Sequence, residues 1–337
     1  MDTAISAGIN ITKQCNSKCR YCLSWQITDA SQPTLEEVKS IVDSLALLGF
    51  QRIAFSGGEP LLRNDLTAMV QYAHQNELLV NVLTNGLLAT KKRIYEMIDA
   101  GLKYLTLSMD SINPKIYTYL RGIPYEVFHE RLEECVAIKE KTPQLFLSVH
   151  CVISKTNMSD IPDLVKYLDQ RGVFTSFQVI HPIFNSQGKQ IQSPLYFSLA
   201  DKPELEEVIN KLIEMKYKGY KISSSKFYLE NIPRYSIENR FPEGHRCRAG
   251  YTSVAIDHHL NVYACWPMQS VGNLKQTSLE KLWYSRDYQK IRQKMWNIEC
   301  PKCWLSCHAE LGADARMREI KQLMRESIAN QENMQNE

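Results

Sequence analysis

The sequence lacks a long hydrophobic run, a strong charge of either sign and a recognisable secretion signal. Its 337 residues carry a formal net charge of +3, which is too small to indicate binding to nucleic acid or to a membrane surface. No apolar stretch approaches the roughly 20 residues that a membrane-spanning helix needs. The first residues have neither a basic region nor a long apolar core, so we expect no cleaved signal peptide.

Internal repeats and low-complexity segments are also absent, and the composition is that of an ordinary globular protein, with 44% hydrophobic and 23% charged residues. Cysteine is better represented, with ten residues. In a chain without a secretion signal, this number indicates metal ligation rather than disulfides. Three cysteines lie between residues 15 and 22 and five between 247 and 307. Cys135 and Cys151 stand alone in apolar segments, where we expect core residues.

The first group, Cys15, Cys19 and Cys22, has C-x3-C-x2-C spacing directly after the apolar stretch 7–12. A four-iron cluster usually takes four cysteines, so three thiolates leave one iron open to bind something else. The same spacing places all three on one helical face, as in a buried stripe. The polar residues between them disfavour that alternative. A single zinc ion is the other alternative, but it would need a fourth ligand nearby.

With Tyr21 before the third cysteine, this segment resembles the C-x3-C-x-aromatic-C signature of radical SAM enzymes. The resemblance implies that Cys15, Cys19 and Cys22 bind a [4Fe–4S] cluster, and that Tyr21 lies at the S-adenosylmethionine (SAM) site. In that family, one electron from the cluster splits SAM into methionine and a 5′-deoxyadenosyl radical, which takes a hydrogen atom from an unactivated carbon. The protein then contributes positioning and the exclusion of water.

A second motif, Gly57-Gly58-Glu59 before Pro60, follows a predicted strand at 52–55. The carboxyl ends of strands carry the site in parallel α/β barrels, and glycines let a backbone approach closely. Glu59 could accept a hydrogen bond from a ligand ammonium group. Alone, the motif is better explained as a tight turn before a helix. Together with the cysteines, it resembles the radical SAM motif that holds the methionine amine of SAM.

Polar residues also follow the predicted strands 78–83 and 104–107: Asn85 after the first, and Ser108 and Asp110 after the second. Similar positions in the family contact the ribose and carboxylate of SAM, so the resemblance implies a SAM-binding role for all three. Arg121 could pair with that carboxylate in a fork geometry. A strand-end turn or a helix cap explains each of these residues equally well.

From residue 6 to about 182, strand-like and helix-like segments alternate, which predicts a parallel α/β sheet with helices on its outer face. Periodicity alone does not separate an open doubly wound sheet from a barrel. The resemblance implies a partial (β/α)6 TIM-like barrel at 1–182, a bridging region at 183–243 and a SPASM/twitch domain at 244–308, followed by a C-terminal helix and tail at 309–337. The aromatic-rich stretch 217–241 either joins the domains or contacts substrate.

The second cysteine group surrounds a predicted hairpin at 254–257 and 261–264, and its members are Cys247, Cys265, Cys300, Cys303 and Cys307. This segment resembles the small α+β SPASM or twitch extension of radical SAM proteins, although Leu260 stands where the family usually has glycine. Five thiols can saturate one cluster but not two. We therefore expect one auxiliary [4Fe–4S] cluster, hence two in the chain. A zinc ribbon is the structural alternative.

One of the five cysteines is then spare. The resemblance favours Cys247, Cys265 and Cys307 as ligands, which leaves Cys300 and Cys303 to supply the fourth ligand and the spare thiol. A spare buried cysteine is ordinarily structural. It could instead return a hydrogen atom to a substrate radical, and donation from the opposite face would make the enzyme an epimerase.

The resemblance points to modification of a peptide or another natural-product scaffold. Because the cysteine loop begins at residue 15, we expect no appended peptide-recognition domain, so a sugar, aminoglycoside or nucleoside substrate stays an alternative. A non-catalytic iron–sulfur electron carrier or zinc module would not explain residues 57–59 or the six strand–helix units. The implied electron donor is a low-potential flavodoxin or ferredoxin. An oxygen-labile cluster fits a reducing cytoplasm.

Overall fold

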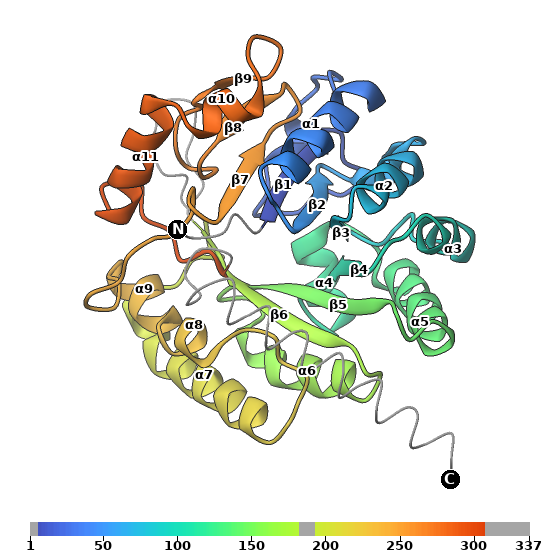
Figure 1. Cartoon of the computed structure of the whole chain (residues 1–337). Coiled ribbons are helices and arrows are strands. Elements are labelled where there is room, and N and C mark those ends of the chain that lie inside the picture. Colours follow the sequence, from blue (N-terminus) through green and yellow to red (C-terminus); the bar gives the residue numbers. More distant parts are fainter. Residues whose placement is uncertain (1–5, 182–192, 307–337) are drawn as a thin grey trace.

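Six parallel strands form the first half of the molecule. The computed structural model of the chain describes residues 6–181 and 193–306. Each strand pairs with the next one along the chain, and Figure 1 shows them curving around a centre with helices outside. The strands are β1 (Ser6–Thr12), β2 (Arg52–Gly57), β3 (Leu79–Thr84), β4 (Tyr104–Ser108), β5 (Phe146–Ile153) and β6 (Phe174–Val179). This arrangement confirms the predicted partial barrel and excludes the doubly wound alternative, whose strands would not follow chain order.

Helices cover one face of this sheet. Alternate strand residues such as Ile9, Phe55 and Val82 point toward that face, and they are apolar and fully buried. The connections contain α1 (Leu35–Leu47), α2 (Leu66–Gln75), α3 (Lys91–Asp99), α4 (Pro114–Arg121), α5 (Tyr125–Lys141) and α6 (Ile161–Asp169). A capping box begins α1, since Thr34 and Glu37 cap each other's backbone N–H groups. The core therefore lies between the sheet and the outer helices.

The opposite face of the sheet is polar along its middle. On β4 the Thr106 hydroxyl donates to Asn81 Oδ1 at 3.1 Å and lies 3.0 Å from Ser148 Oγ. On the neighbouring strands, His150 Nδ1 lies 2.8 Å from Ser176 Oγ. At the amino ends of the strands, the rings of Tyr104, Phe146 and Phe174 pack in a row. The concave side of the sheet thus has an aromatic floor and a polar middle layer, which suits a bound polar molecule better than a packed apolar core.

The second half adds helices and three more strands to the same sheet. The helices are α7 (Lys202–Tyr217), α8 (Lys226–Glu230), α9 (Ile232–Glu238), α10 (Leu279–Trp283) and α11 (Arg286–Trp296). The strands are β7 (Ser253–Ile256), β8 (Asn261–Tyr263) and β9 (Gly272–Asn273). The predicted hairpin is present, but β7 also pairs in parallel with β1, so the sheet runs unbroken from β6 to β9. Leu260 has φ +69°, which is the left-handed conformation that glycine adopts most easily.

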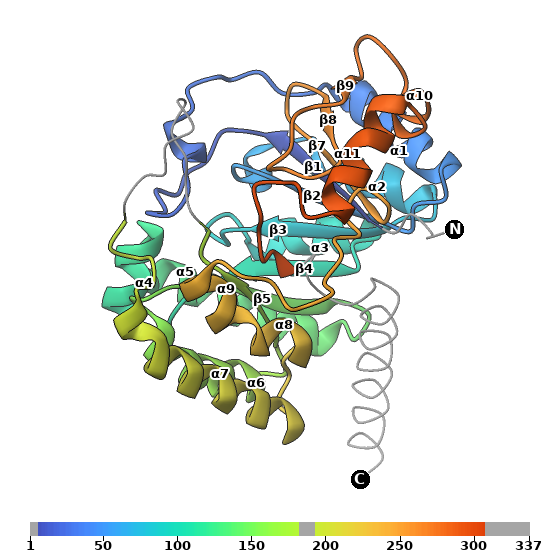
Figure 2. The same ribbon diagram turned by 90° about the vertical axis from the view of Figure 1, so that its left-hand side faces the viewer.

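Helices α8 and α9 connect the second cysteine group to the barrel. Trp304 is fully buried and its ring stacks on Tyr228, while its Nε1–H donates to the Tyr228 carbonyl at 3.0 Å. The Tyr228 hydroxyl accepts from the Val179 N–H on β6 at 3.0 Å. Figure 2 shows α8 and α9 between α7 and the red C-terminal segment. For residues 226–238 these contacts support the bridging interpretation over a substrate-binding one.

Several sequence predictions lie outside the described residues: the C-terminal helix and tail, Cys307, and the start of the bridging region at 183–192. Among the helices that the structure does describe, none is both long enough and apolar enough to cross a membrane.

Candidate active site

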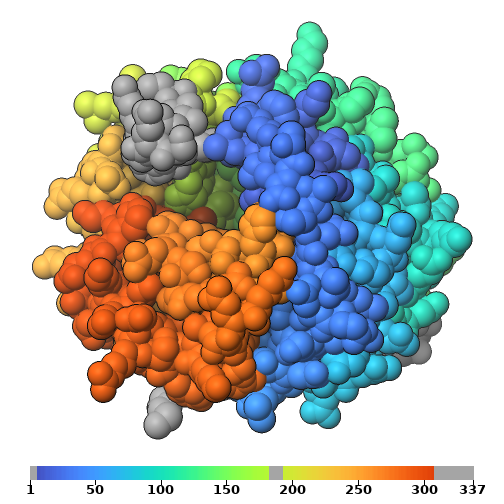
Figure 3. Space-filling view, turned by 90° about the horizontal axis from the view of Figure 1, so that it is seen from above, coloured from blue at the N-terminus to red at the C-terminus, as the bar shows by residue number. Residues whose placement is uncertain are grey.

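The first cysteine loop leaves the carboxyl end of β1. Cys19 is buried, whereas Cys15 and Cys22 are half-buried. Burial raises the pKa of the Cys15 thiol to about 11, so its thiolate needs a compensating positive group. Seen from above in Figure 3, a hollow opens between the blue N-terminal part of the chain and the orange C-terminal part. The loop therefore lies at the open end of the barrel, where the carboxyl ends of the strands meet.

Each of the three sulfur atoms has a polar neighbour. Ser17 Oγ lies 3.1 Å from Cys19 Sγ, and the Ser24 N–H donates to Cys22 Sγ at 3.4 Å. Polar contacts to sulfur ligands tune metal centres. The third contact comes from another strand, because Asn85 follows β3 and its Nδ2 lies 3.9 Å from Cys15 Sγ.

The spacing of the sulfur atoms disfavours a single zinc ion. Tetrahedral zinc, with Zn–S bonds of about 2.3 Å, would hold its sulfur ligands roughly 3.8 Å apart. Within residues 6–181 and 193–306, the groups of three ligand atoms that all lie within 4.8 Å of one another include no cysteine. The described cysteines of either group are thus not arranged around a single tetrahedral ion in this structure.

Gly57 and Gly58 pack against the backbone at the start of the cysteine loop. Two backbone hydrogen bonds hold this segment in place. The Gly58 N–H donates to the Thr12 carbonyl at 2.9 Å, and the Glu59 N–H donates to the Gln14 carbonyl at 2.8 Å. A Cβ at Gly57 would lie 2.1 Å from the Thr12 oxygen, and one at Gly58 would lie 2.0 Å from the Gln14 oxygen. The close approach expected from the sequence is therefore an approach to protein backbone. It aligns the end of β2 with the cysteine loop.

Glu59 is fully buried, and its carboxylate accepts hydrogen bonds from three protein groups. Oε1 accepts from the Leu61 N–H at 2.9 Å and from the Thr84 hydroxyl at 2.7 Å. Oε2 accepts from the Asn85 N–H at 2.7 Å, which leaves it capacity for one more donor. Burial raises the pKa of Glu59, while these hydrogen bonds favour the ionised form. Glu59 thus ties the end of β2 to the end of β3.

Asp110 and Arg121 form a buried ion pair beneath the loop. Arg121 Nε lies 2.7 Å from Asp110 Oδ2, and an Arg121 terminal N–H donates to Oδ1 at 3.0 Å. The Tyr21 hydroxyl donates to Oδ2, and the Val152 N–H donates to Oδ1 at 2.8 Å. Burial opposes the charge of Arg121, yet the Asp110 carboxylate raises the guanidinium pKa well above its usual value. The guanidinium fork expected to face a ligand carboxylate is thus directed at Asp110.

Ser108 differs from these residues because its hydroxyl has no hydrogen-bond partner within the described part of the chain. It ends β4 and is half-buried on the concave side. The side-chain amide of Asn85, by contrast, is hydrogen-bonded at both ends. Its Nδ2 donates to Asn16 Oδ1 at 2.7 Å, and its Oδ1 accepts from the Leu87 N–H at 3.0 Å. Of the predicted strand-end residues, Ser108 is therefore the one most available to a ligand.

In the C-terminal group, Cys265 is buried, and Cys247, Cys300 and Cys303 are half-buried. The segment with Cys300 and Cys303 is held in place by the contacts of the neighbouring Trp304. Burial raises the pKa of Cys300, and the nearby Cys303 adds to this effect.

Sequence reasoning missed two features of the site. Helix α4, which carries Arg121, was not predicted, although Asn113 caps its first turn, Pro114 begins it and Gly122 ends it at φ +63°. Ser17 was also missed. Its hydroxyl donates to the Arg121 carbonyl at 2.8 Å and so joins the cysteine loop to α4. No local signal in the sequence distinguishes Ser17 from any polar loop residue.

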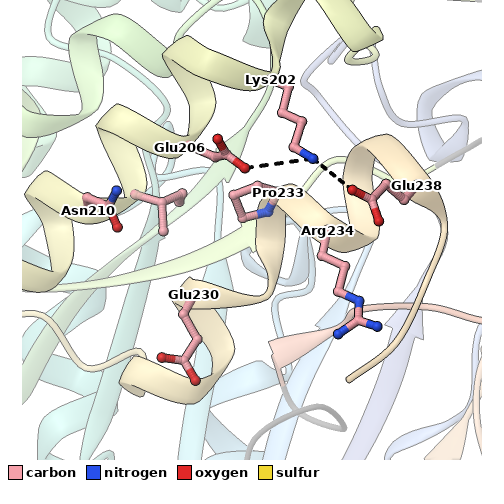
Figure 4. Close-up of a pocket in the computed structure, with 8 residues that line it drawn as sticks. Lys202, Glu206, Asn210, Glu230, Pro233, Arg234 and Glu238 are labelled. Carbon is pink, nitrogen blue, oxygen red and sulfur yellow. Dashed lines mark hydrogen bonds and ion pairs between the residues drawn. The ribbon is translucent and has the colours of Figure 1, made fainter. Parts of the chain in front are cut away.

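Another groove lies elsewhere on the molecule. It has a volume of about 330 Å³ and is lined by residues of α7, α8 and α9, without any cysteine. Lys202 lies between two carboxylates, 2.8 Å from Glu238 and 3.9 Å from Glu206 (Figure 4). Its central cation is thus already paired, and the groove shows no reactive group. The chemistry-bearing residues gather instead at the mouth of the barrel.

Comparison with known proteins agrees with this site. The family model of the radical SAM superfamily matches residues 9–168, and the SPASM model, an iron–sulfur cluster-binding domain, matches residues 247–308. Over 160 residues the chain is 31% identical to PqqA peptide cyclase of Bradyrhizobium diazoefficiens; this match covers 47% of the chain but only 41% of that protein. Over 294 residues it is 22% identical to Fe-coproporphyrin III synthase of Methanosarcina barkeri, covering 81% of the chain and 72% of that protein.

Solved structures share the fold. The structure of anSMEcpe with bound AdoMet aligns at a TM-score of 0.69 and 17% identity, covering 98% of this chain and 99% of that one. Streptococcus suis SuiB bound to S-adenosylmethionine aligns at 0.65 and 17% identity, covering 86% and 68%. The two family matches imply SAM and iron–sulfur clusters as cofactors. The chain therefore contains a radical SAM domain at residues 9–168 and, toward its C-terminus, a SPASM iron–sulfur cluster-binding domain at residues 247–308.

Proposed function

We propose that this protein uses a [4Fe–4S] cluster on Cys15, Cys19 and Cys22 to cleave SAM and to abstract a hydrogen atom from a peptide. The observation that carries the proposal is the loop itself: three cysteines, spaced too widely for one ion, above a polar cavity face. When bound, the cluster and SAM together supply the 5′-deoxyadenosyl radical. The chain's own work is to hold the loop, position SAM and keep water out.

The proposed SAM site lies along the strand ends beside the loop. Ser108 offers a free hydroxyl, the Gly57–Glu59 backbone borders the loop, and Asn85 adjoins Cys15. Tyr21, Asp110 and Arg121 stay in the proposal as SAM-site residues, with a bracing role in addition. Their mutual contacts hold the third cysteine's segment against β4 and α4.

A peptide is the proposed substrate because the relative with 31% identity over the radical SAM region is a peptide cyclase. The test is to incubate reconstituted, reduced enzyme with SAM and candidate peptides in deuterated water. Formation of 5′-deoxyadenosine should rise with the substrate peptide, whose mass should change in step. Turnover stimulated by a porphyrin, a sugar, an aminoglycoside or a nucleoside, and not by peptides, would replace the peptide with that class.

The proposed second cluster uses four of the five C-terminal cysteines, with Cys300 or Cys303 as the spare thiol. A spare S–H would pass its hydrogen atom to the substrate carbon radical, and the sulfur radical would then need one electron and one proton to reset. Outcomes other than epimerisation stay open to the same radical.

The spare thiol is tested by changing each of the five cysteines to alanine separately. We expect four variants to lose the auxiliary cluster's iron, about four atoms per chain. The fifth should keep all its iron and still form 5′-deoxyadenosine, yet lose the deuterium-labelled product. The measurements are iron content and product mass spectra. If all five variants lose iron, no cysteine is spare and the donor role fails.

The electron donor is proposed to dock on the outer side of the cysteine loop. A cavity of about 550 Å³ there reaches Cys19 and Cys22 and is lined by the cations Lys18 and Arg20. Trp25 and Tyr119, both partly exposed, lie on the same surface. Positive charge beside two cluster ligands fits an acidic low-potential carrier such as flavodoxin or ferredoxin.

Replacing Lys18 and Arg20 together by glutamate should slow flavodoxin-driven SAM cleavage by about tenfold or more, because long-range attraction becomes repulsion. The effect should shrink as ionic strength rises. Cleavage driven by dithionite should change little, since that small reductant needs no docking surface. Lys290→Glu, on α11, is the matched control. Equal slowing with both reductants would show that the two cations act on the cluster rather than on docking.

A further inference from the structure

Two adjacent histidines and an aspartate meet where the N-terminal and C-terminal domains join. His258 and His259 occupy the turn between β7 and β8, and Asp29 lies in the connection before α1. Because β7 runs parallel to β1, this turn lies at the same end of the sheet as the cysteine loop. Figure 3 shows the blue and orange segments in contact at the rim of the hollow.

The three side chains converge on a point between them. Asp29 Oδ2 lies 3.0 Å from His259 Nε2 and 4.0 Å from His258 Nε2. All three ligand atoms lie within 4.8 Å of one another, and no other such group exists among the described residues. A tetrahedral zinc ion with bonds of about 2.0–2.1 Å would hold such atoms roughly 3.3 Å apart. The two measured separations lie on either side of that value.

His258 supplies an independent observation that points to a ligand. Its side chain is only 9% exposed, and neither ring nitrogen has a hydrogen-bond partner within the described residues. Buried polar groups are normally paired, so this imidazole lacks an expected partner. A buried imidazole whose two ring nitrogens both lack a partner suits a metal ligand.

The other two side chains are already oriented. The Ser31 hydroxyl lies 3.1 Å from His259 Nδ1, which leaves Nε2 facing Asp29. The Ser31 N–H donates to Asp29 Oδ1 at 2.8 Å, which leaves Oδ2 facing the histidines. Metal-binding imidazoles and carboxylates commonly have their second polar atom fixed in this way.

We propose that Asp29, His258 and His259 bind a divalent first-row transition-metal ion, with zinc expected. Two imidazoles and one carboxylate suit zinc and also ferrous iron, with water at the remaining position. The ion would tie the connection after the cysteine loop to the β7–β8 turn and so hold the two domains together at the mouth. The site is separate from both cysteine groups and does not depend on the proposed reaction.

The test uses the full chain with its clusters reconstituted, so that the cysteines are occupied. Zinc or ferrous iron is offered in separate samples, and the protein is desalted before metal analysis. The wild type should keep about one additional ion per chain, with nitrogen and oxygen ligands at about 2.0–2.1 Å by X-ray absorption. Asp29→Asn and His258→Asn should weaken binding by tenfold or more, whereas His74→Gln, an exposed histidine on α2, should not.

If the protein retains ferrous iron in place of zinc, seen as a high-spin ferrous signal distinct from the clusters, the proposed site stands and its metal is iron. A zinc spectrum with sulfur ligands at about 2.3 Å would place the ion at cysteines and overturn the proposal. Equal metal retention by Asp29→Asn and the wild type, or no retention of either ion by the wild type, would overturn it as well. Asp29 is exposed, so its variant is a fair test even if His258→Asn fails to fold.

Discussion

Replacing Cys15, Cys19 and Cys22 together by alanine is expected to reduce SAM cleavage to the background of a protein-free mixture. In our account the three thiols hold the cluster that passes the electron to SAM. The fold should persist, because these side chains lie on a loop and Cys15 and Cys22 are only half-buried. The measurement is 5′-deoxyadenosine formed by reconstituted, dithionite-treated protein, with circular dichroism to check the fold.

Cys135→Ala is the matched control for this experiment. Cys135 is fully buried on α5, far along the chain from either cysteine group, so its loss should leave iron content and SAM cleavage unchanged. Residual 5′-deoxyadenosine in the triple variant, above that of the protein-free mixture, would show that the catalytic cluster is bound elsewhere.

The second large effect concerns the ion pair beneath the loop. Asp110→Asn leaves Arg121 charged in a site where only 6% of the residue is exposed, and removes the charged acceptor of Tyr21. Breaking one partner of a buried pair typically costs about 3–5 kcal/mol. We expect a loss of this size in the free energy of unfolding, measured by urea denaturation of the cluster-free protein. The loosened loop should also retain less iron after reconstitution.

Two control variants separate charge burial from other losses. Tyr21→Phe removes one hydrogen bond and should cost only about 1 kcal/mol. Replacing both Asp110 and Arg121 by apolar residues, Asp110→Leu with Arg121→Met, should destabilise less than Asp110→Asn alone, because no unpaired charge remains. If the double variant were less stable than the single one, the pair itself would be a net source of stability.

Much of the barrel was predictable because each strand and helix has its own local signal. The alternation of apolar and polar residues locates the strands, and caps such as Thr34 locate the helix starts. The curvature of the sheet and its extension by β7 were not predictable. Pairing between β1 and β7 joins segments more than 200 residues apart in the sequence, and neither segment carries a local signal for the other. The family resemblance, rather than periodicity, supplied the barrel.

At the site, the sequence located the right segments but not all of their contacts. The sequence predicted that Glu59 and Arg121 contact a ligand. In the structure Glu59 is hydrogen-bonded to Thr84 and Asn85, and Arg121 is paired with Asp110. A charged residue at a strand end has the same local signature whether its partner is a ligand or protein. The histidine pair at 258 and 259 gave no signal, because its aspartate partner lies more than 200 residues earlier in the sequence.

The central claim, that SAM binds an open iron on the cysteine loop, is tested most directly by magnetic resonance on the reduced protein. SAM carrying ¹⁵N in its amine and ¹⁷O in its carboxylate is added to dithionite-reduced wild type, and couplings to the cluster's electron spin are recorded. Our account predicts couplings from both labels in the wild type and none in the Cys15, Cys19 and Cys22 alanine variant. Binding of labelled SAM to the wild type by equilibrium dialysis, without coupling from either label, would contradict it.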